Sequence, residues 1–265
     1  MGKWNYQSEL KCRWFRLQKV LVSYPEASVF KSLFETVSKL LEEVKLSFLE
    51  EGLKIKAMDP SNVALIDVIF PREAFSEFVL EEPIEVGISM SSMLKVMKRA
   101  KRGDRFELEA DEENVVIKLI SSSRKKYSLR NIEVASQEIP ELNLTFDAKI
   151  RMVTDPLKTI LKDIGLAGSN ATFEASEEEG KLIIYSEEEK KYRTEIRKDS
   201  TSVLEMNVKG TAKSTYDVLY LINILSLTKV SDSILIEFSS QSPIKTEFEV
   251  VGGGRIFYYL APTQT

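Results

Sequence analysis

The sequence predicts an α+β fold made of two similar units in one chain. Some segments carry apolar residues at helical spacing, and others alternate apolar and polar residues as half-buried strands do. Both kinds of segment return in the same order about 128 positions later, as expected for an internal repeat. The chain has 265 residues, of which 43% are hydrophobic, so each unit is long enough to form a core.

The first unit begins with a strand followed by a helix. Val20-Leu21-Val22 has the pattern of a strand. Residues 28–44 place their apolar side chains on one helical face, with Ser28 as the expected N-cap. A turn is predicted at Glu50-Glu51-Gly52. Further along this unit we expect a strand at 53–56, a helix at 92–102 and a strand at 105–109.

The second unit repeats this order. Asp155-Pro156 opens a helix, with Asp155 as the cap and Pro156 in the first turn. We expect strands at 171–175 and 182–185, a helix at 216–227 and a strand at 233–237. Six positions of the first unit have the identical residue type 128 positions later: Glu50, Glu51, Gly52, Lys101, Asp104 and Glu109. The chain therefore contains two copies of one supersecondary unit.

Two segments lie outside the repeat. Residues 1–19 hold both tryptophans and a formal charge of +4, and form either a basic N-terminal extension or a segment foreign to the folded unit. Residues 131–145 lack helical or strand periodicity and are interrupted by Pro140, which predicts a connector packed on the surface. The predicted limits are 20–130 for the first domain and 146–265 for the second.

The composition argues against most kinds of catalysis. The chain has no His, which removes the commonest general base and metal ligand. No phosphate-binding loop is found, Cys12 is alone, and Gly252-Gly253-Gly254 is best interpreted as a turn. We therefore expect no catalytic residue, no metal site and no cofactor. The alternative is a metal-dependent nuclease built from carboxylates, which would need three or four acids in one concave site.

Nothing in the sequence predicts a membrane or secreted protein. No apolar run approaches the roughly 18 residues that span a bilayer, and the N-terminus lacks a secretory pattern. We expect an intracellular protein. The net charge of −4 argues against a protein that coats DNA, but not against one with a single basic surface.

Four segments carry a resemblance to a known family. Residues 51–65, EGLKIKAMDPSNVAL, resemble the first-domain signature of proliferating cell nuclear antigen, the sliding clamp of archaea and eukaryotes. Residues 94–104 resemble its basic helix, 138–141 its interdomain connector, and 258–262 its near-terminal tail. The resemblance extends in order from about Val20 to Pro262.

The resemblance implies a DNA clamp fold and a non-enzymatic role as a processivity factor. Three chains would form a homo- or heterotrimeric ring, with helices lining the hole and sheets outside. The implied partners are duplex DNA without sequence preference, two further clamp subunits, a clamp loader, and DNA polymerase, flap endonuclease and DNA ligase bound through short motifs. The implied location is the cytoplasm and nucleoid of an archaeon, or the nucleus of a eukaryote. A clamp-like checkpoint scaffold remains the alternative within this fold.

The predicted DNA-facing surface consists of cations on the four helices. Residues 95–102 hold five of them and no acid, while the apolar residues of that segment form the buried stripe. Phosphate contacts of this kind are independent of sequence and weaken with salt. The predicted DNA-binding residues are Lys31, Lys39, Lys95, Lys98, Arg99, Lys101, Arg102, Lys158, Lys162 and Lys229.

The resemblance also implies a docking groove under the connector and a subunit contact at strand edges. The predicted groove residues are Met58, Asn62, Val63, Leu65, Ile139, Pro140, Pro243, Tyr259, Leu260, Ala261 and Pro262. An unpaired strand edge is a template for another chain, and residues 114–120 and 192–197 are the candidate edges. The predicted interface residues are Asn114, Val116, Lys118, Ile120, Tyr192, Thr194 and Ile196.

Overall fold

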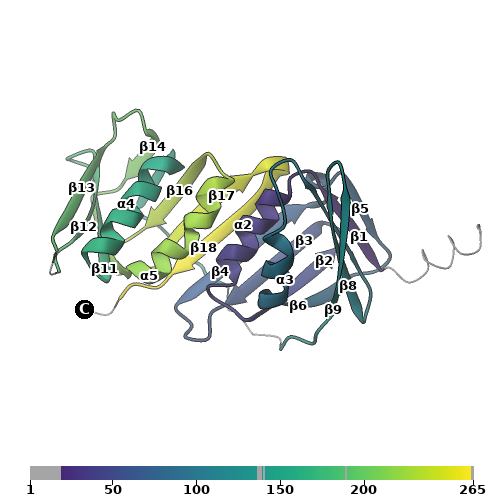
Figure 1. Cartoon of the computed structure of the whole chain (residues 1–265). Coiled ribbons are helices and arrows are strands. Elements are labelled where there is room, and N and C mark those ends of the chain that lie inside the picture. Colours follow the sequence, from purple (N-terminus) through teal and green to yellow (C-terminus); the bar gives the residue numbers. More distant parts are fainter. Residues whose placement is uncertain (1–18, 136–138, 140, 189, 264–265) are drawn as a thin grey trace, which may run out of the picture.

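The structure is a computed structural model, and it describes residues 19–135, 139, 141–188 and 190–263. The expected N-terminal extension, apart from Lys19, and Pro140 therefore lie outside the described residues. The chain is elongated, with a row of helices on one face of a long curved layer of strands (Figure 1). No helix in the described ranges is long and apolar enough to cross a membrane.

The strands form three antiparallel sheets. The first has five strands in the order β5-β1-β7-β8-β9, and it forms one end of the molecule (Figure 1). β1 and β7 are mostly buried, and buried residues alternate with half-buried ones along β8, so one face of the sheet packs on the core. The strands are β1 (Val20–Tyr24), β5 (Glu77–Leu80), β7 (Arg105–Ala110), β8 (Asn114–Ile120) and β9 (Arg124–Arg130).

The second sheet has nine strands and runs through both halves of the chain. Its order is β14-β10-β16-β17-β18-β4-β3-β2-β6, and the join between the halves is the antiparallel pair β18–β4. Its first-half strands are β2 (Glu43–Leu49), β3 (Gly52–Met58), β4 (Ala64–Pro71) and β6 (Ile84–Ser89). Its second-half strands are β10 (Ala148–Val153), β14 (Val203–Val208), β16 (Ser233–Phe238), β17 (Ile244–Val250) and β18 (Gly254–Leu260).

The third sheet closes the opposite end of the molecule in the order β13-β12-β11-β15 (Figure 1). Its strands are β11 (Asn170–Ser176), β12 (Lys181–Ser186), β13 (Tyr192–Arg197) and β15 (Thr211–Asp217). Three sheets thus contain the predicted repeat: β5-β1-β7-β8-β9 corresponds to β14-β10-β16-β17-β18, and β4-β3-β2-β6 corresponds to β13-β12-β11-β15.

Four helical segments form the row. Helix α2 contacts both α3 and the 3-10 helix η2, and η2 contacts α4. The helices are α2 (Ala27–Val37), α3 (Met90–Met97), α4 (Thr154–Ala167) and α5 (Val218–Leu221), and the 3-10 segments are η1 (Arg72–Ala74), η2 (Ile222–Lys229) and η3 (Val251–Gly253). The glycine turn predicted at 252–254 is present, with φ of +83° at both Gly252 and Gly253.

The helix limits differ from the predicted ones for local reasons. Helix α2 ends at Val37, seven residues before the predicted end. Val44, which the prediction placed on the apolar face of the helix, is instead a buried residue of β2. Its N-cap is Glu26, not Ser28, since the Glu26 carboxylate accepts from the Ser28 amide at 3.3 Å. Helix α4 begins at Thr154, two residues early, so Asp155 lies in its first turn and is not the cap.

The other two helices are shorter than predicted. Helix α3 ends at Met97, and residues 98–102 form turns. Tyr216 belongs to β15, and the helix predicted at 216–227 is a four-residue α5 followed by the 3-10 segment η2. The expected strands are all present, each extended by one to three residues.

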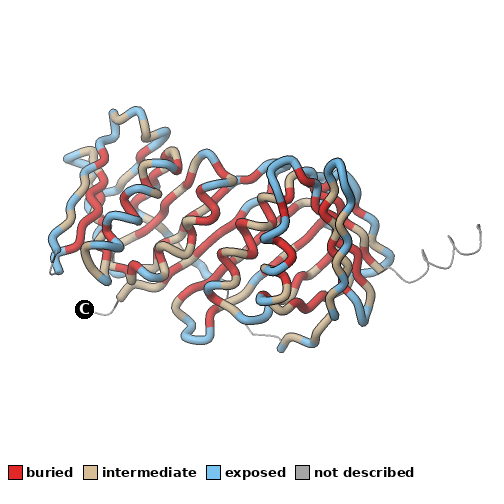
Figure 2. The backbone as a smooth tube through the Cα atoms, viewed as in Figure 1, coloured by how far each residue is buried: buried red, intermediate tan, exposed pale blue. Residues whose placement is uncertain are grey.

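One continuous core joins the two halves. In the first half the rings of Phe30 and Phe106 stack at 4.4 Å between centroids, and Tyr24 packs edge-on against Phe30. The Tyr24 hydroxyl donates to the Val251 carbonyl of the second half. Buried residues follow the inner faces of the helices and sheets along the whole molecule (Figure 2). The helix row is therefore held rigidly on the sheets that carry it.

Candidate nucleic-acid and partner-binding surfaces

The densest positive charge lies at the end of α3. Met93, Val96, Met97 and Ala100 are buried, and the five cations Lys95, Lys98, Arg99, Lys101 and Arg102 are all exposed. Only Lys95 is within the helix, and the other four lie on the turns that follow it. None of the five belongs to an ion pair within the part of the chain that the structure describes. We call these five residues the cationic turn.

Asp104 holds the shape of this turn. Its carboxylate accepts from the Lys101 amide at 3.0 Å, and its side chain is 3% exposed. The bond from the Lys101 amide, together with that from Ser121 and the charges of Lys125 and Lys101, holds the pKa of the Asp104 carboxyl below its ordinary value despite burial. The single acid next to the cationic turn is therefore turned inward and ionised.

The other predicted cations are less available. The ammonium of Lys39 lies 3.3 Å from the Asn223 carbonyl, and lost hydration lowers its pKa. Lys229 pairs with Glu35 at 3.5 Å, which links η2 to α2 across the two halves. Lys31 and Lys158 are half-buried on α2 and α4, and Lys162 is exposed on α4. The structure thus concentrates the available positive charge at the α3 end of the row.

The loop after β3 is built around Asp59. This carboxylate is 3% exposed and accepts from the amides of Val63 at 2.7 Å and Ala64 at 2.6 Å. It also accepts from the Tyr220 hydroxyl at 3.2 Å, so the loop is attached to α5 of the second half. Asn62 at the tip has φ of +56°, a conformation that Asn tolerates better than most residues. Sequence reasoning missed Asp59, although Asp-Pro-Ser-Asn is a recognisable Asx-type turn.

The C-terminal tail crosses from this loop to the third sheet. The Ala261 amide donates to the Val63 carbonyl, and the Thr263 amide donates to the Thr215 carbonyl of β15, both at 2.9 Å. Pro262 and Thr263 then line a cavity of about 720 Å³ with Lys213, Thr215 and Gln241. The tail, the Asp59 loop and the edge of β15 are thus brought together.

The predicted groove residues fall into two groups. Met58, Asn62, Val63, Ile139, Pro243, Tyr259, Ala261 and Pro262 are at least partly exposed. Leu65 and Leu260 are 3% and 0% exposed. Leu260 packs in the core, whereas Leu65 lies opposite Tyr259 on the other face of the nine-stranded sheet. Leu260 therefore supports the tail from beneath, and contact of either leucine with a partner stays a prediction.

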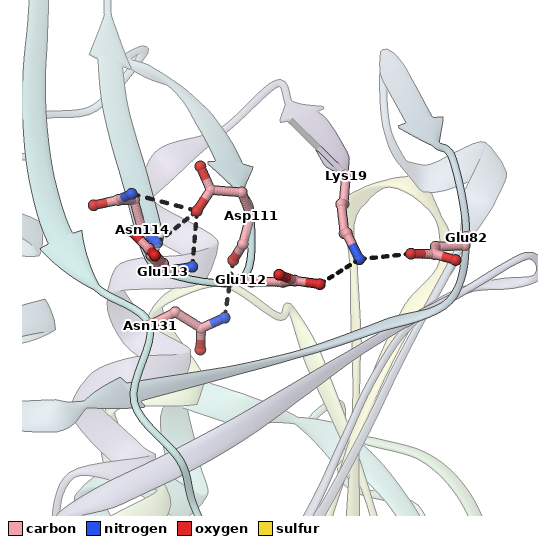
Figure 3. Close-up of polar contacts among 7 residues, drawn as sticks. All are labelled: Lys19, Glu82, Asp111, Glu112, Glu113, Asn114 and Asn131. Carbon is pink, nitrogen blue, oxygen red and sulfur yellow. Dashed lines mark hydrogen bonds and ion pairs between the residues drawn. The ribbon is translucent and has the colours of Figure 1, made fainter. Parts of the chain in front are cut away.

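The start of the connector is fastened to β6 and to the turn before β8. The Asn131 amide group donates to the Asp111 carbonyl at 2.9 Å (Figure 3). The Asn131 side-chain oxygen accepts from the Gly87 amide of β6, also at 2.9 Å. The Ile132 amide donates to the Gly87 carbonyl at 3.0 Å. A Cβ on Gly87 would lie 1.9 Å from the Ile132 carbonyl oxygen, so only glycine permits this approach. Lys19 lies beside this network, paired with Glu82 at 2.6 Å and Glu112 at 2.8 Å (Figure 3).

One of the two predicted edge strands is an edge and the other is not. β13 is an edge, as predicted for residues 192–197. β8 is not, because it pairs with β7 on one side and β9 on the other, and Lys118 bonds to Glu109 within the sheet. The prediction that Asn114, Val116, Lys118 and Ile120 lie on an open edge is therefore wrong, and the edge is β9. The repeat contains the missed signal, since β9 corresponds to β18.

In the described part of the chain, no group of three or more acids or cysteines is placed to hold a metal ion. The acidic runs at 177–179 and 187–188 lie on turns and in the segment after β12.

Comparisons with known proteins agree with the fold and the repeat. Two family models match: proliferating cell nuclear antigen, N-terminal domain, over residues 21–147, and its C-terminal domain over residues 138–263. The chain is 34% identical to DNA polymerase sliding clamp 1 of Aeropyrum pernix, covering 90% of this chain and 98% of the relative. It is 32% identical to DNA polymerase sliding clamp 1 of Pyrobaculum aerophilum, covering 93% and 99%.

Solved structures give the same result. A PCNA2–PCNA3 complex from Sulfolobus tokodaii matches with a TM-score of 0.85 and 30% identity, covering 91% of this chain and 98% of the matched chain. The A. fulgidus PCNA bound to the C-terminal region of FEN-1 matches with a TM-score of 0.81 and 25% identity, covering 93% and 99%.

Proposed function

The chain belongs to the proliferating cell nuclear antigen family of DNA polymerase sliding clamps, and we propose that it is a ring subunit that encircles duplex DNA and tethers other proteins to it. One observation carries this proposal. The two-fold internal repeat places four helical segments in one row on one face, with the cationic turn at its end and an open strand edge at each end of the molecule (Figure 1).

The helix row is the proposed DNA-facing wall. Its charge is a set of exposed, flexible Lys and Arg side chains that suit phosphates and form no pattern for reading base edges. A clamp must slide along DNA. It therefore needs contacts that attract the phosphates without fixing the protein at one position on the duplex. The cationic turn is proposed to supply most of the attraction, and Lys39 and Lys229 to contribute less because they already bond across the two halves.

The tail, the Asp59 loop and the connector form the proposed client groove. A relative's structure holds the C-terminal region of FEN-1, which supports a groove for short peptides in this chain as well. Polymerase, flap endonuclease and ligase are the proposed clients, and a clamp loader the proposed loading partner. We place the connector at 131–145, between domains at 20–130 and 146–265, and we propose that the protein acts with the DNA of the cell interior.

Further clamp subunits are proposed to add edge to edge at β9 and β13. These are long, regular edges of seven and six residues. Of the other sheet edges in the described ranges, β5 has four residues, β14 is bulged, β6 is covered by the connector and β15 by the tail. Short, bulged or covered edges are poor templates for another chain. A head-to-tail contact of this kind closes into a ring.

We also propose that the chain is not an enzyme. The lack of His in the sequence and the dispersal of the described acids over turns support this view. No catalytic residue, metal or cofactor is required for tethering.

The DNA-facing wall is tested by removing charge from the cationic turn. The variant K98A/R99A/K101A removes three positive charges, so its binding to circular duplex DNA should weaken. The slope of the log binding constant against log salt concentration should become shallower by about 2–3. The thermal midpoint should stay unchanged, because these side chains are exposed. The control K190A/K191A removes exposed cations from the loop between β12 and β13, at the other end of the molecule. An unchanged salt slope in the triple variant would refute the assignment.

A further inference from the structure

The two units of the chain differ at one place where the repeat predicts the same packing. In the first unit Arg72 follows β4 directly, and its amide donates to the Glu51 carbonyl at 2.9 Å. In the second unit Lys198 follows β13 directly, and its amide donates to the Gly180 carbonyl at 2.9 Å. Because β13 is the counterpart of β4, Lys198 is the counterpart of Arg72.

The strands that come next give a second pair of counterparts. Phe78 of β5 lies opposite Val22 of β1, and Met206 of β14 lies opposite Ile150 of β10. Val22 and Ile150 lie 128 positions apart, which is the spacing of the repeat. Met206 is therefore the residue of the second unit that corresponds to Phe78 of the first.

The first unit closes this place with its own side chains. The Arg72 guanidinium lies 5.0 Å from the centre of the Phe78 ring, over its face, and donates to the Phe78 carbonyl at 2.9 Å. The Phe75 ring packs against the Phe78 ring at 5.3 Å between centroids. Two aromatic rings and one cation therefore meet where β4 leads into β5.

The second unit has neither ring. Residues 198–206 contain no aromatic residue. A cavity of about 340 Å³ lies here, lined by both Lys198 and Met206. Its other apolar lining is Phe146, directly after the connector, and Val208 of β14, both half-buried. We call this the second-unit cavity, and its size is close to the lower limit of ligand pockets, about 300 Å³.

Hydrogen bonds between loops hold the walls of the second-unit cavity. The Glu177 amide donates to the Gly210 carbonyl, and the Gly210 amide donates to the Glu177 carboxylate, both at 2.8 Å. The Lys209 amide donates to the Asp147 carbonyl, also at 2.8 Å. These bonds fasten the turn after β12's partner strand β11 to the turn after β14, and that turn to the start of β10. The cavity is therefore formed in advance, which lowers the ordering cost of binding.

The charge at the rim favours an anion. Two of the charged lining residues are already engaged, since Glu177 bonds to the turn after β14 and Lys149 pairs with a buried glutamate of β16 at 2.8 Å. Lys198 and Lys209 are exposed, and neither belongs to an ion pair among the residues that the structure describes. Asp147 is the one acid beside them in the cavity lining that is not so engaged. Two available cations thus face one acid.

We propose that the second-unit cavity binds an aromatic side chain of a partner protein that carries an acidic residue next to it. The ring takes the place that Phe78 holds in the first unit, packed against Met206 and below the Lys198 ammonium. The acidic residue bonds to Lys198 or Lys209 at the rim. The lining shares no residue with the proposed client groove. It is therefore a second docking site, and its binding does not depend on the proposed ring.

A fluorinated peptide tests the proposal. The probe is the capped tripeptide Glu-Phe-Glu with fluorine on its ring, and its fluorine NMR signal is followed in titrations with the full chain. We expect a saturable change of that signal. The peptide Lys-Phe-Lys, with the same fluorinated ring, should need at least a tenfold higher concentration for half-saturation, because Lys198 and Lys209 repel it. The absence of a saturable change up to ~10 mM peptide would contradict the proposal.

Two variants locate the bound ring. K198E/K209E reverses the available charge at the rim and should raise the concentration for half-saturation at least tenfold. K198R/M206F gives the second unit the cation and ring of the first, and should exclude the probe to the same extent because its own ring fills the cavity. The control K190E/K191E reverses two exposed cations outside the cavity and should bind like the wild type. Circular dichroism melts should show that all three variants are folded.

The results that would overturn the proposal are distinct. Folded K198E/K209E and K198R/M206F variants that bind like the wild type would show that the ring binds elsewhere. Equal weakening in K190E/K191E would show that the probe responds only to general charge. I139E adds a charge to the proposed client groove and should leave the probe unaffected. Weakening in I139E but not in the cavity variants would place the probe in that groove.

Discussion

At the scale of single residues, two buried carboxylates shape the surfaces that the exposed residues present. Asp59 closes the loop beside the tail and Asp104 closes the cationic turn, both by accepting backbone amides. Neither side chain is exposed, so neither contacts a partner directly. Their role is to hold other residues, and their loss would appear first as disorder in a turn.

Asp104 predicts a pH dependence. Its pKa is lowered in the folded chain, so its contribution to stability is full above the ordinary carboxyl pKa and is lost as the pH falls through the folded value. D104A should therefore lower the free energy of unfolding by about 1–3 kcal/mol at neutral pH and by much less in acid. Urea unfolding at several pH values measures this difference. An equal loss at every pH would show that the carboxylate's charge is unimportant.

Single residues were also where the sequence was hardest to interpret. The cations of residues 95–102 are obvious in the sequence, but their partners are not. Only the structure shows that Lys229 is paired with Glu35 and that Lys39 lies against carbonyls of the other half. Likewise Leu65 and Leu260 fit a groove by position, but both are buried, Leu260 in the core and Leu65 opposite Tyr259 on the other face of the sheet.

At the scale of elements, helix and strand identity followed from periodicity, and element ends did not. Val44 extends the apolar stripe of α2 but belongs to the alternating pattern of β2, so the helix was predicted too long. β8 was mistaken for an edge, although buried and half-buried residues alternate along it as they do in a central strand with one solvated face. Whether a strand is an edge depends on which strands pair with it. Those partner strands lie elsewhere in the sequence and cannot be inferred from the strand itself.

The connector predicts an effect of one glycine. G87A should release residues 131–132 from β6, because a Cβ there would overlap the Ile132 carbonyl. Hydrogen exchange of the Ile132 amide should accelerate by at least tenfold while exchange in β7 stays slow. G165A is the matched control, since a Cβ at Gly165 meets nothing closer than 3.7 Å and Ala is the better helix residue. Unchanged protection of Ile132 in G87A would contradict the anchoring role of Gly87.

At the scale of the whole molecule, the repeat is the feature that sequence revealed best. Identical residue types 128 positions apart predicted two like units, and the sheet orders match strand for strand. The sequence could not show that the units share one sheet, because the β18–β4 pair joins segments nearly 190 residues apart. That join makes the chain one rigid arc of helices over strands, with open edges at its two ends (Figure 1).

The central claim is that this arc closes around DNA, and topology tests it most directly. The assembled protein is loaded onto nicked circular duplex in low salt, washed in high salt to remove phosphate contacts, and the DNA is then cut once. We predict that the protein stays on the circle through the wash and leaves within the time of cutting, because only an encircling ring is released by a free end. Loss during the wash, or retention after linearisation, would contradict the account.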